Sequence, residues 1–275
     1  MQVDDDCESY NIRGYAGDNS NSIYENGVVV ASCDDIYIGG KHRKCGRSGV
    51  AIFNGVGVAM NIEVNGIYQD NDFIGIRARG ITRLRIVPGT LVKGNGNVLV
   101  GGQYSANINV SNSGGAPYNQ GAGAFICQAV NVENGGVGGV VCDYISSVTI
   151  DDTPGADNCQ SGSGSGVTVS NANFLWVRNN AMRSSNSNQQ SGFVIASSVA
   201  TCWEWGNRAP GSVVNEVANA SPLRKGQNRD TAIPLGSFTP TGAYPNEGSW
   251  NTTSLGNAIS TLVDSMQRNG QLNKN

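Results

Sequence analysis

Short stretches in which apolar and polar residues alternate recur along most of this chain of 275 residues. One clear unit pairs residues 166–169 with residues 175–180, where an Asn-rich turn follows the second strand. The centres of these second strands recur on average about every 24 residues, and they are Asn11, Tyr37, Glu63, Arg85, Asn109, Asn131, Thr149, Trp176 and Glu204. A coil of two or three short strands with tight turns needs about that many residues, so the spacing predicts a parallel β-solenoid.

The alternation also predicts which side chains face the interior. Apolar residues stand on both sides of most centres, and a period of two places them inside and the centre outside. Most first strands follow a glycine, as expected at a corner with unusual backbone angles: Gly49, Gly75, Gly139, Gly166 and Gly192. Asn or Gly follows the second strands, and a short third strand is expected at residues 67–68, 91–92 and 181–182.

Three strands per coil with a tight Asn corner resembles the right-handed parallel β-helix of pectate lyases and of bacteriophage tailspike and tail fibre proteins. The resemblance covers about residues 7–208. It predicts an all-β fold, a right-handed parallel β-helix of about eight to nine coils. We expect three parts, namely the β-helix at 1–208, an extended Pro-rich strap or linker at 209–251, and a capping or oligomerising C-terminal α-helix at 252–275.

Composition excludes several classes of protein. The net charge is −3, so a general nucleic-acid-binding surface is not expected. No apolar run approaches the ~18 residues of a membrane span. The acidic residues 1–6 lack the apolar stretch of a signal peptide. The seven cysteines show no CxxC spacing and are expected to be free thiols in the core: Cys7, Cys33, Cys45, Cys127, Cys142, Cys159 and Cys202.

The outward row of the second strands contains the candidate ligand-binding residues. Stacked coils would place Glu63 beside Arg85, and Trp176 beside Glu204. An exposed Trp next to a carboxylate suits a sugar, because the ring covers an apolar sugar face and the carboxylate accepts hydrogen bonds from the sugar hydroxyls. The alternative is that the strap covers Trp176.

The outward row of the first strands contains a candidate interface. It is expected to run through Ala51, Arg77, Leu99, Val141, Thr168 and Val194. The apolar members, Leu99, Val141 and Val194, should not line up exposed on a soluble monomer, so the strap or a second copy must cover them. In the C-terminal helix, a heptad stripe of Leu255, Ile259, Leu262 and Met266 also needs a partner. The sequence thus predicts a homo-oligomer, and the tailspike resemblance implies a trimer.

Chemistry beyond binding is weakly indicated. Glu204, Asp143 and Glu63 are weak catalytic candidates, because neighbouring coils bring carboxylates to glycosidase spacing by chance. Asp151, Asp152 and Asp157 could bind Ca²⁺ or could be solvated corners, and no other cofactor is expected. The single histidine, His42, lies in a run at 41–47 that we interpret as a basic loop.

The leading functional hypothesis is a virion tailspike or tail fibre component that recognises a host-surface polysaccharide. Its partners would be that glycan and other virion tail proteins. One alternative is a polysaccharide-degrading enzyme, either a lyase or a glycoside hydrolase, because the same fold supports both. A second alternative is a purely structural spike element.

Overall fold

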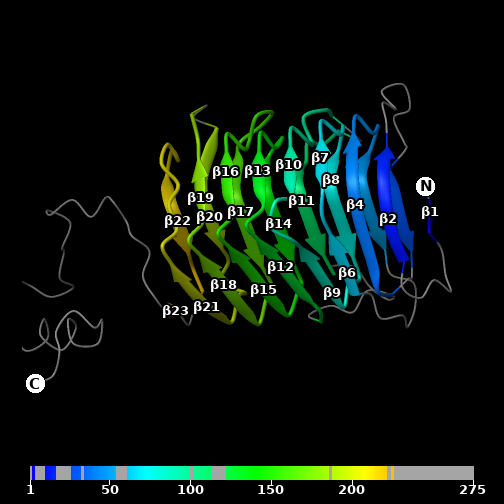
Figure 1. The fold of residues 1–275 in the computed structure, drawn as a ribbon. Coiled ribbons are helices and arrows are strands. Elements are labelled where there is room, and N and C mark those ends of the chain that lie inside the picture. The colour runs from blue at the N-terminus through cyan, green and yellow to red at the C-terminus, as the bar shows by residue number, and fades with distance from the viewer. Residues whose placement is uncertain are drawn as a thin grey trace, which may run out of the picture. The chain divides into compact units, whose positions relative to one another are not determined.

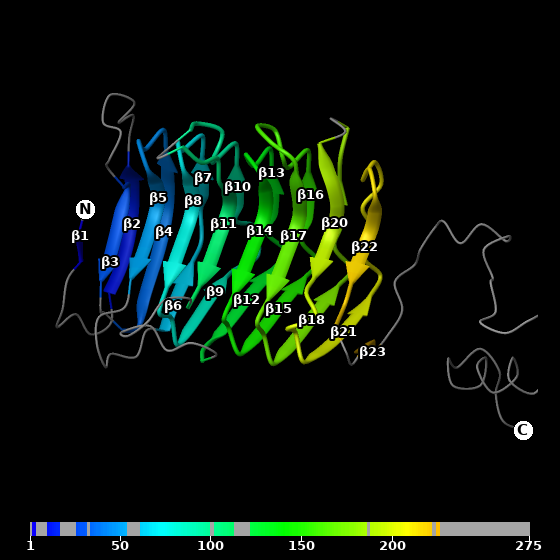
Figure 2. The same ribbon diagram turned by 180° about the vertical axis from the view of Figure 1, so that it is seen from behind.

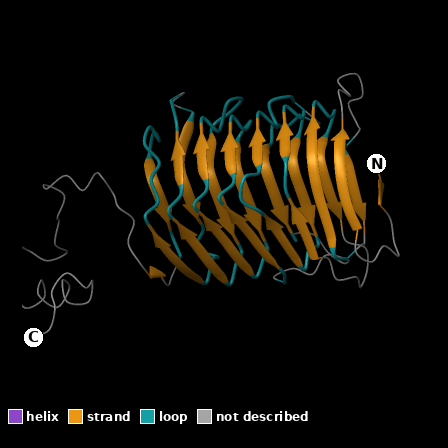
Figure 3. Cartoon of the chain, viewed as in Figure 1, coloured by secondary structure: helices purple, strands orange, loops and turns teal. Residues whose placement is uncertain are grey.

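The computed structural model describes residues 2–3, 10–16, 26–31, 34–53, 61–99, 102–112, 122–185, 188–221 and 224–225. They form a parallel β-solenoid of about six turns, within the unit Met1–Asp230 (Figure 1). The described part contains strands and loops and no helix (Figure 3), which confirms the all-β prediction. The count of eight or nine coils stays a prediction, because the end strands belong to turns that are described only in part.

Each turn crosses up to three faces, and successive turns lie side by side (Figures 1 and 2). The first face is a nine-stranded sheet of β1 (Gln2–Val3), β3 (Val28–Ala31), β5 (Ser48–Phe53), β8 (Ile74–Arg79), β11 (Ala106–Ser111), β14 (Gly138–Asp143), β17 (Gly164–Ser170), β20 (Gln189–Ile195) and β22 (Asn215–Asn219). The second face has β2 (Tyr10–Ala16), β4 (Ile36–Arg43), β6 (Asn61–Val64), β9 (Arg83–Ile86), β12 (Ala124–Gln128), β15 (Ser147–Asp151), β18 (Phe174–Arg178), β21 (Thr201–Trp205) and β23 (Arg224–Lys225). The third face has β7 (Ile67–Gln69), β10 (Leu91–Lys93), β13 (Asn131–Glu133), β16 (Pro154–Ala156) and β19 (Ala181–Arg183), which include the three expected short strands. The second and third faces form one 14-stranded sheet, because β4 pairs with both β6 and β7.

The core is a set of columns in which one apolar side chain per turn stacks on the next. One second-face column, fully buried, runs through Ile36, Ile62, Leu84, Phe125, Val148, Leu175 and Cys202. Burying each large side chain contributes about 1.5–3 kcal/mol. The described cysteines are buried and free, as predicted: Cys45, Cys127, Cys142, Cys159 and Cys202. Burial raises the pKa of the Cys45 thiol to about 11, so it is a core residue and a poor nucleophile. Cys7 and Cys33 lie outside the described residues.

The predicted register is wrong in the middle of the chain. Asn109 lies on β11 of the first face and Asn131 on β13 of the third face, while Ile126 occupies the second-face position between Arg85 and Thr149. The reason is an unequal repeat, since Arg85 and Ile126 are separated in sequence by much more than the average repeat but are adjacent in the sheet. Segments 94–105 and 112–123 enlarge this turn. An even spacing therefore assigned residues to the wrong faces.

Asparagine side chains form a hydrogen-bonded ladder inside the corner between the third and first faces. Asn71, Asn95 and Asn158 each stand two residues after a third-face strand. The Asn71 amide donates to Asn95 Oδ1 at 2.7 Å. In the next turn this position is Gly135, and Asn107 reaches in from β11 instead. Its Oδ1 accepts from the Asn95 amide at 2.8 Å, and its Nδ2 donates to Asn158 Oδ1 at 3.1 Å. The ladder therefore continues across a turn that lacks the usual asparagine.

On the first face the replacement runs the other way, with asparagine at a position where the neighbouring turns have glycine. The residues aligned with Asn107 in the other strands from β5 to β20 are all glycine, namely Gly49, Gly75, Gly139, Gly166 and Gly192. A Cβ at Gly75 would lie 2.7 Å from Nδ2 of Asn95, which is too close. A side chain at this first-face position would therefore occupy the space that the ladder asparagine of the following corner fills, and Asn107 fits because that corner has Gly135 instead. Three of the glycines that the sequence suggested as sharp corners, Gly49, Gly75 and Gly139, instead leave space for asparagines of the ladder.

The expected basic loop at 41–47 is wrong at its start, because Lys41–Arg43 is the end of β4. His42 points inward and is buried, with its ring stacked on Tyr68 of the next turn at a centroid distance of 5.1 Å. Its Nε2 lies 3.0 Å from the carbonyl oxygen of Gly39. Burial lowers the pKa of His42, because the charged imidazolium loses its hydration there.

We expect the free energy of unfolding to fall as the pH is lowered from 7 towards 5. The unfolded chain keeps the ordinary His pKa of about 6.5 and takes up the proton first, so acid favours the unfolded state until the folded pKa is reached. Because His42 is the only histidine, His42→Phe should flatten this part of the profile. Urea unfolding at several pH values tests this, and an unchanged slope in the variant would contradict it.

The solenoid extends beyond the expected boundary at residue 208. β22 pairs with β20 and β23 pairs with β21, both in parallel, so the start of the expected strap continues the coil. The sequence analysis missed these strands because the prolines in this part of the chain indicated an irregular segment. The rest of the strap and the expected helix at 252–275 lie outside the described residues.

Candidate functional site

Two rows of outward side chains run along the second face. The central row is Tyr37, Glu63, Arg85, Ile126, Thr149, Trp176 and Trp203. The flanking row is Asp35, Asn61, Arg83, Ala124, Ser147, Phe174 and Thr201. Because adjacent strands are about 4.8 Å apart, the step from Arg85 to Trp176 spans roughly 14 Å. The face thus has a charged end and an aromatic end, with smaller side chains between them.

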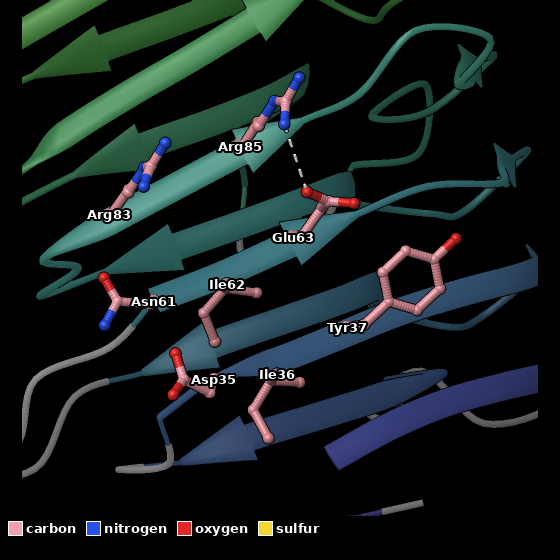
Figure 4. Close-up of a pocket in the computed structure, with 8 residues that line it drawn as sticks. All are labelled: Asp35, Ile36, Tyr37, Asn61, Ile62, Glu63, Arg83 and Arg85. Atoms are coloured by element: carbon pink, nitrogen blue, oxygen red, sulfur yellow. Dashed lines mark ion pairs between the residues drawn. The ribbon is translucent and has the colours of Figure 1, made fainter. Parts of the chain in front are cut away.

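A pocket of about 430 Å³ occupies the charged end (Figure 4). Asp35, Asn61 and Arg83 come from one row and Tyr37, Glu63 and Arg85 from the other, as the labelled side chains show. The structure therefore brings together Glu63 and Arg85, two of the four predicted ligand-binding residues.

The ion pair in this pocket is weak. Arg85 Nη1 lies 3.6 Å from Glu63 Oε2, and both side chains are 41% exposed. An exposed pair of this kind contributes about 0–1 kcal/mol. Asn61 is more firmly held, because its Nδ2 donates to Asp34 Oδ1 at 2.8 Å. A polar ligand could thus displace the Glu63–Arg85 contact at little cost.

The aromatic end is a cluster of Phe174, Trp176 and Trp203. The two indole rings stack with centroids 4.7 Å apart and an angle of 7° between their planes. Phe174 lies 6.4 Å from Trp176 and is 45% exposed. Trp203 covers one ring face of Trp176, so the other face is turned towards Thr149 and the middle of the sheet. That orientation suits a flat apolar group lying over the small residues between the two ends.

The expected pairing of Trp176 with Glu204 is wrong. Trp203 is the neighbour of Trp176, and Glu204 aligns with the buried Val177. Glu204 is only 7% exposed, and its Oε2 has no hydrogen-bond partner among the described residues. A shift of one residue in a strand reverses every side chain. The apolar character of both tryptophans that flank Glu204 predicts them inside, but Cys202 takes the inward position and Trp203 stacks on Trp176 outside.

The three weak catalytic candidates are not brought together. Glu63 faces outward on the second face, Glu204 points inward, and Asp143 lies at the end of β14 on the first face. Asp143 Oδ1 accepts hydrogen bonds from Ser170 Oγ at 2.7 Å and from Asn171 Nδ2 at 2.8 Å. Asp35, rather than Asp143 or Glu204, is the carboxylate that shares the pocket with Glu63.

The candidate calcium ligands make separate contacts. Asp151 is paired with the guanidinium of Arg178. Asp157 Oδ1 accepts hydrogen bonds from the backbone and the hydroxyl of Ser185, at 2.6 and 2.8 Å. Asp152 is exposed in a turn with φ of 47°. No group of three or more acidic, Cys or His side chains suited to a metal occurs among the described residues. Calcium binding stays an untested expectation.

The outward row of the first face, predicted as an interface, differs in the structure from the prediction at one position. Val141 and Val194 do align on the first face, on either side of Thr168, and both are half-buried. Leu99 is 57% exposed but lies between β10 and β11, and Asn109 occupies its expected place. The helix residues Leu255, Ile259, Leu262 and Met266 lie outside the described residues. Oligomerisation stays a prediction.

Known proteins do not decide the function of this arrangement. Comparisons of the chain with family models, curated proteins and solved structures find no match. None of the described residues form a helix with the length and apolar character that crossing a membrane requires. Since a solenoid supports many functions, only the side chains on its faces can indicate which one this chain has.

Proposed function

We propose that the second face binds a polysaccharide of a host-cell surface. The observation that carries this proposal is that the charged pocket and the aromatic cluster occupy the same outward face of one sheet. A sugar ring has an apolar face for Trp176 and hydroxyls for Asp35, Glu63 and Arg85. The intervening distance of roughly 14 Å suits several linked sugars better than one small molecule.

The proposal extends to the biological setting. We place the chain in a bacteriophage tailspike or tail fibre, as a right-handed, pectate-lyase-like β-helix beside other virion tail proteins. A rigid solenoid offers a long surface to a polymer. A homotrimer would cover Val141 and Val194, and the stripe at 255–266 would join its chains. This part of the proposal depends on the resemblance of the fold.

The test is a panel of bacterial capsular polysaccharides and lipopolysaccharides applied to the immobilised full chain. We expect one or a few to bind, and Arg85→Gln to weaken that binding about tenfold through a lost charge-assisted hydrogen bond. Arg183→Gln on the third face is the matched control, with the same loss of charge at an exposed strand residue. Light scattering in the same buffer checks the trimer. A wild-type chain that binds no glycan, or equal binding by the Arg85 variant, would contradict the proposal.

A second candidate function is cleavage of the same polymer. It is favoured by the presence of two carboxylates, Asp35 and Glu63, in one pocket, since glycoside hydrolysis needs a pair of acids. A release of reducing ends that is abolished in Glu63→Gln would identify a depolymerase. Binding without new reducing ends would leave recognition as the function.

A further inference from the structure

A pocket of different character lies on the first face, beside the segment that connects β10 to β11. Its volume is about 250 Å³, and its walls come from β8, β11, β14 and residues 103–105. Arg77 and Arg79 stand at alternate positions on β8, and both are half-buried. No Asp or Glu is among the described residues that line it. The described lining of the pocket therefore combines two positive charges with no acidic side chain.

One of these guanidinium groups is held between two aromatic rings. Arg77 Cζ lies 5.4 Å from the ring centroid of Phe53 and 5.9 Å from that of Phe73. Phe53 belongs to the previous turn, and Phe73 directly precedes β8. A guanidinium stacked on rings keeps its N–H donors in its plane and loses little entropy when they bind a ligand. Arg77 is thus preorganised.

The nearest acid along the same row is turned elsewhere. Arg79 aligns with Ser111, which aligns with Asp143 two turns away. Asp143 Oδ1 is engaged by Ser170 and Asn171 of the turn beyond. The Oδ1 atom of Asp143 is therefore used in contacts outside this pocket.

We propose that this pocket binds an oxyanion, a carboxylate or a phosphate, carried on a molecule the size of a monosaccharide. Two neighbouring guanidinium groups match the paired oxygens of either anion. The pocket also offers the ring of Tyr104, which is 39% exposed, and the side-chain amides of Gln103 and Asn109. A bare anion would leave these groups unused, whereas a sugar would contact them. The pocket is smaller than the sites that usually hold larger organic ligands. The site is on the other sheet from the proposed glycan site. Val141 also lines this pocket, so a trimer contact that covers Val141 and an open pocket are alternatives for this part of the first face.

The experiment is calorimetric titration of the full chain at low salt with glucuronate, glucose 6-phosphate, inorganic phosphate and glucose. We expect at least one charged sugar to bind, glucose not to bind, and the affinity to fall as salt is raised. Arg79→Gln should weaken binding at least tenfold. Arg77→Lys, which keeps the charge and loses the planar fork, should also weaken it. Arg183→Gln is the control and should bind as the wild type does.

The outcomes separate the sources of the anion and can overturn the proposal. Tighter binding of glucuronate supports a carboxylate, and tighter binding of glucose 6-phosphate supports a phosphate. Inorganic phosphate binding as tightly as both sugars would overturn the sugar part. Absence of binding by every charged probe, or equal affinity in folded Arg79→Gln and Arg77→Lys, would overturn the site itself.

Discussion

Replacing Asn107 by Gly is expected to destabilise the solenoid by about 3–5 kcal/mol and to lower its Tm by on the order of 10 °C. The Asn107 side chain accepts two hydrogen bonds from Asn95 and donates to Glu133 O and Asn158 Oδ1, all within 3.1 Å. Asn107 and its partners Asn95 and Asn158 are buried, so its loss leaves the backbone N–H of Asn95 without this acceptor. The Asn95 Nδ2, Asn158 Oδ1 and Glu133 O groups each lose one hydrogen bond and keep another. An unsatisfied buried group costs about 1–3 kcal/mol, and each further lost hydrogen bond costs about 0.5–1.5 kcal/mol. Thermal unfolding by circular dichroism measures the effect.

Asn179→Gly provides a matched control for this prediction. Asn179 is an exposed turn residue with φ of 53°, a left-handed conformation that glycine adopts without strain. The same substitution there should change the stability by less than about 1 kcal/mol. Similar Tm values for the two variants would show that the ladder does not hold the enlarged turn in register.

The parts of the fold that sequence predicted are those set by local alternation. Columns such as Ile36 above Ile62 and Val148 above Leu175 follow from apolar residues spaced two apart in each strand. The face to which each strand belongs was less predictable, because the register between turns also depends on the lengths of the loops. The enlarged turn before Ile126 carries no periodic signal, so Asn109 was assigned to the wrong face.

The sequence likewise predicted the candidate site only where the repeat is regular. Glu63 and Arg85 were paired correctly, because their turns have regular lengths. Trp203 was missed, because an apolar side chain was expected inside and only its stacking on Trp176 accounts for its place outside. The Asn–Gly exchange at Asn107 depends on space between chain segments far apart in sequence, so no local pattern revealed it.

Trp176→Ala is expected to weaken binding of the polysaccharide by at least about 30-fold, if the second face is the glycan site. The ring face of Trp176 that is turned away from Trp203 points towards the middle of that face. Loss of an aromatic anchor typically costs about 2 kcal/mol or more. The Tm should fall by only about 2–4 °C, because the stacking on Trp203 contributes about 1 kcal/mol. Surface plasmon resonance and thermal unfolding of the same samples separate the two effects.

The control for Trp176 is Trp205→Ala on the neighbouring strand. Trp205 is more exposed than the half-buried Trp176, but its ring packs against the guanidinium of Arg178 at 5.3 Å and lies outside the two rows that we assign to the glycan. Its loss should leave the affinity within about threefold of the wild type, since a cation–π contact of this kind contributes mainly to local packing. Equal losses in the two variants would mean that the ligand is not aligned with the central row. Full binding by folded Trp176→Ala would exclude the aromatic end and leave the charged pocket as the whole of the site.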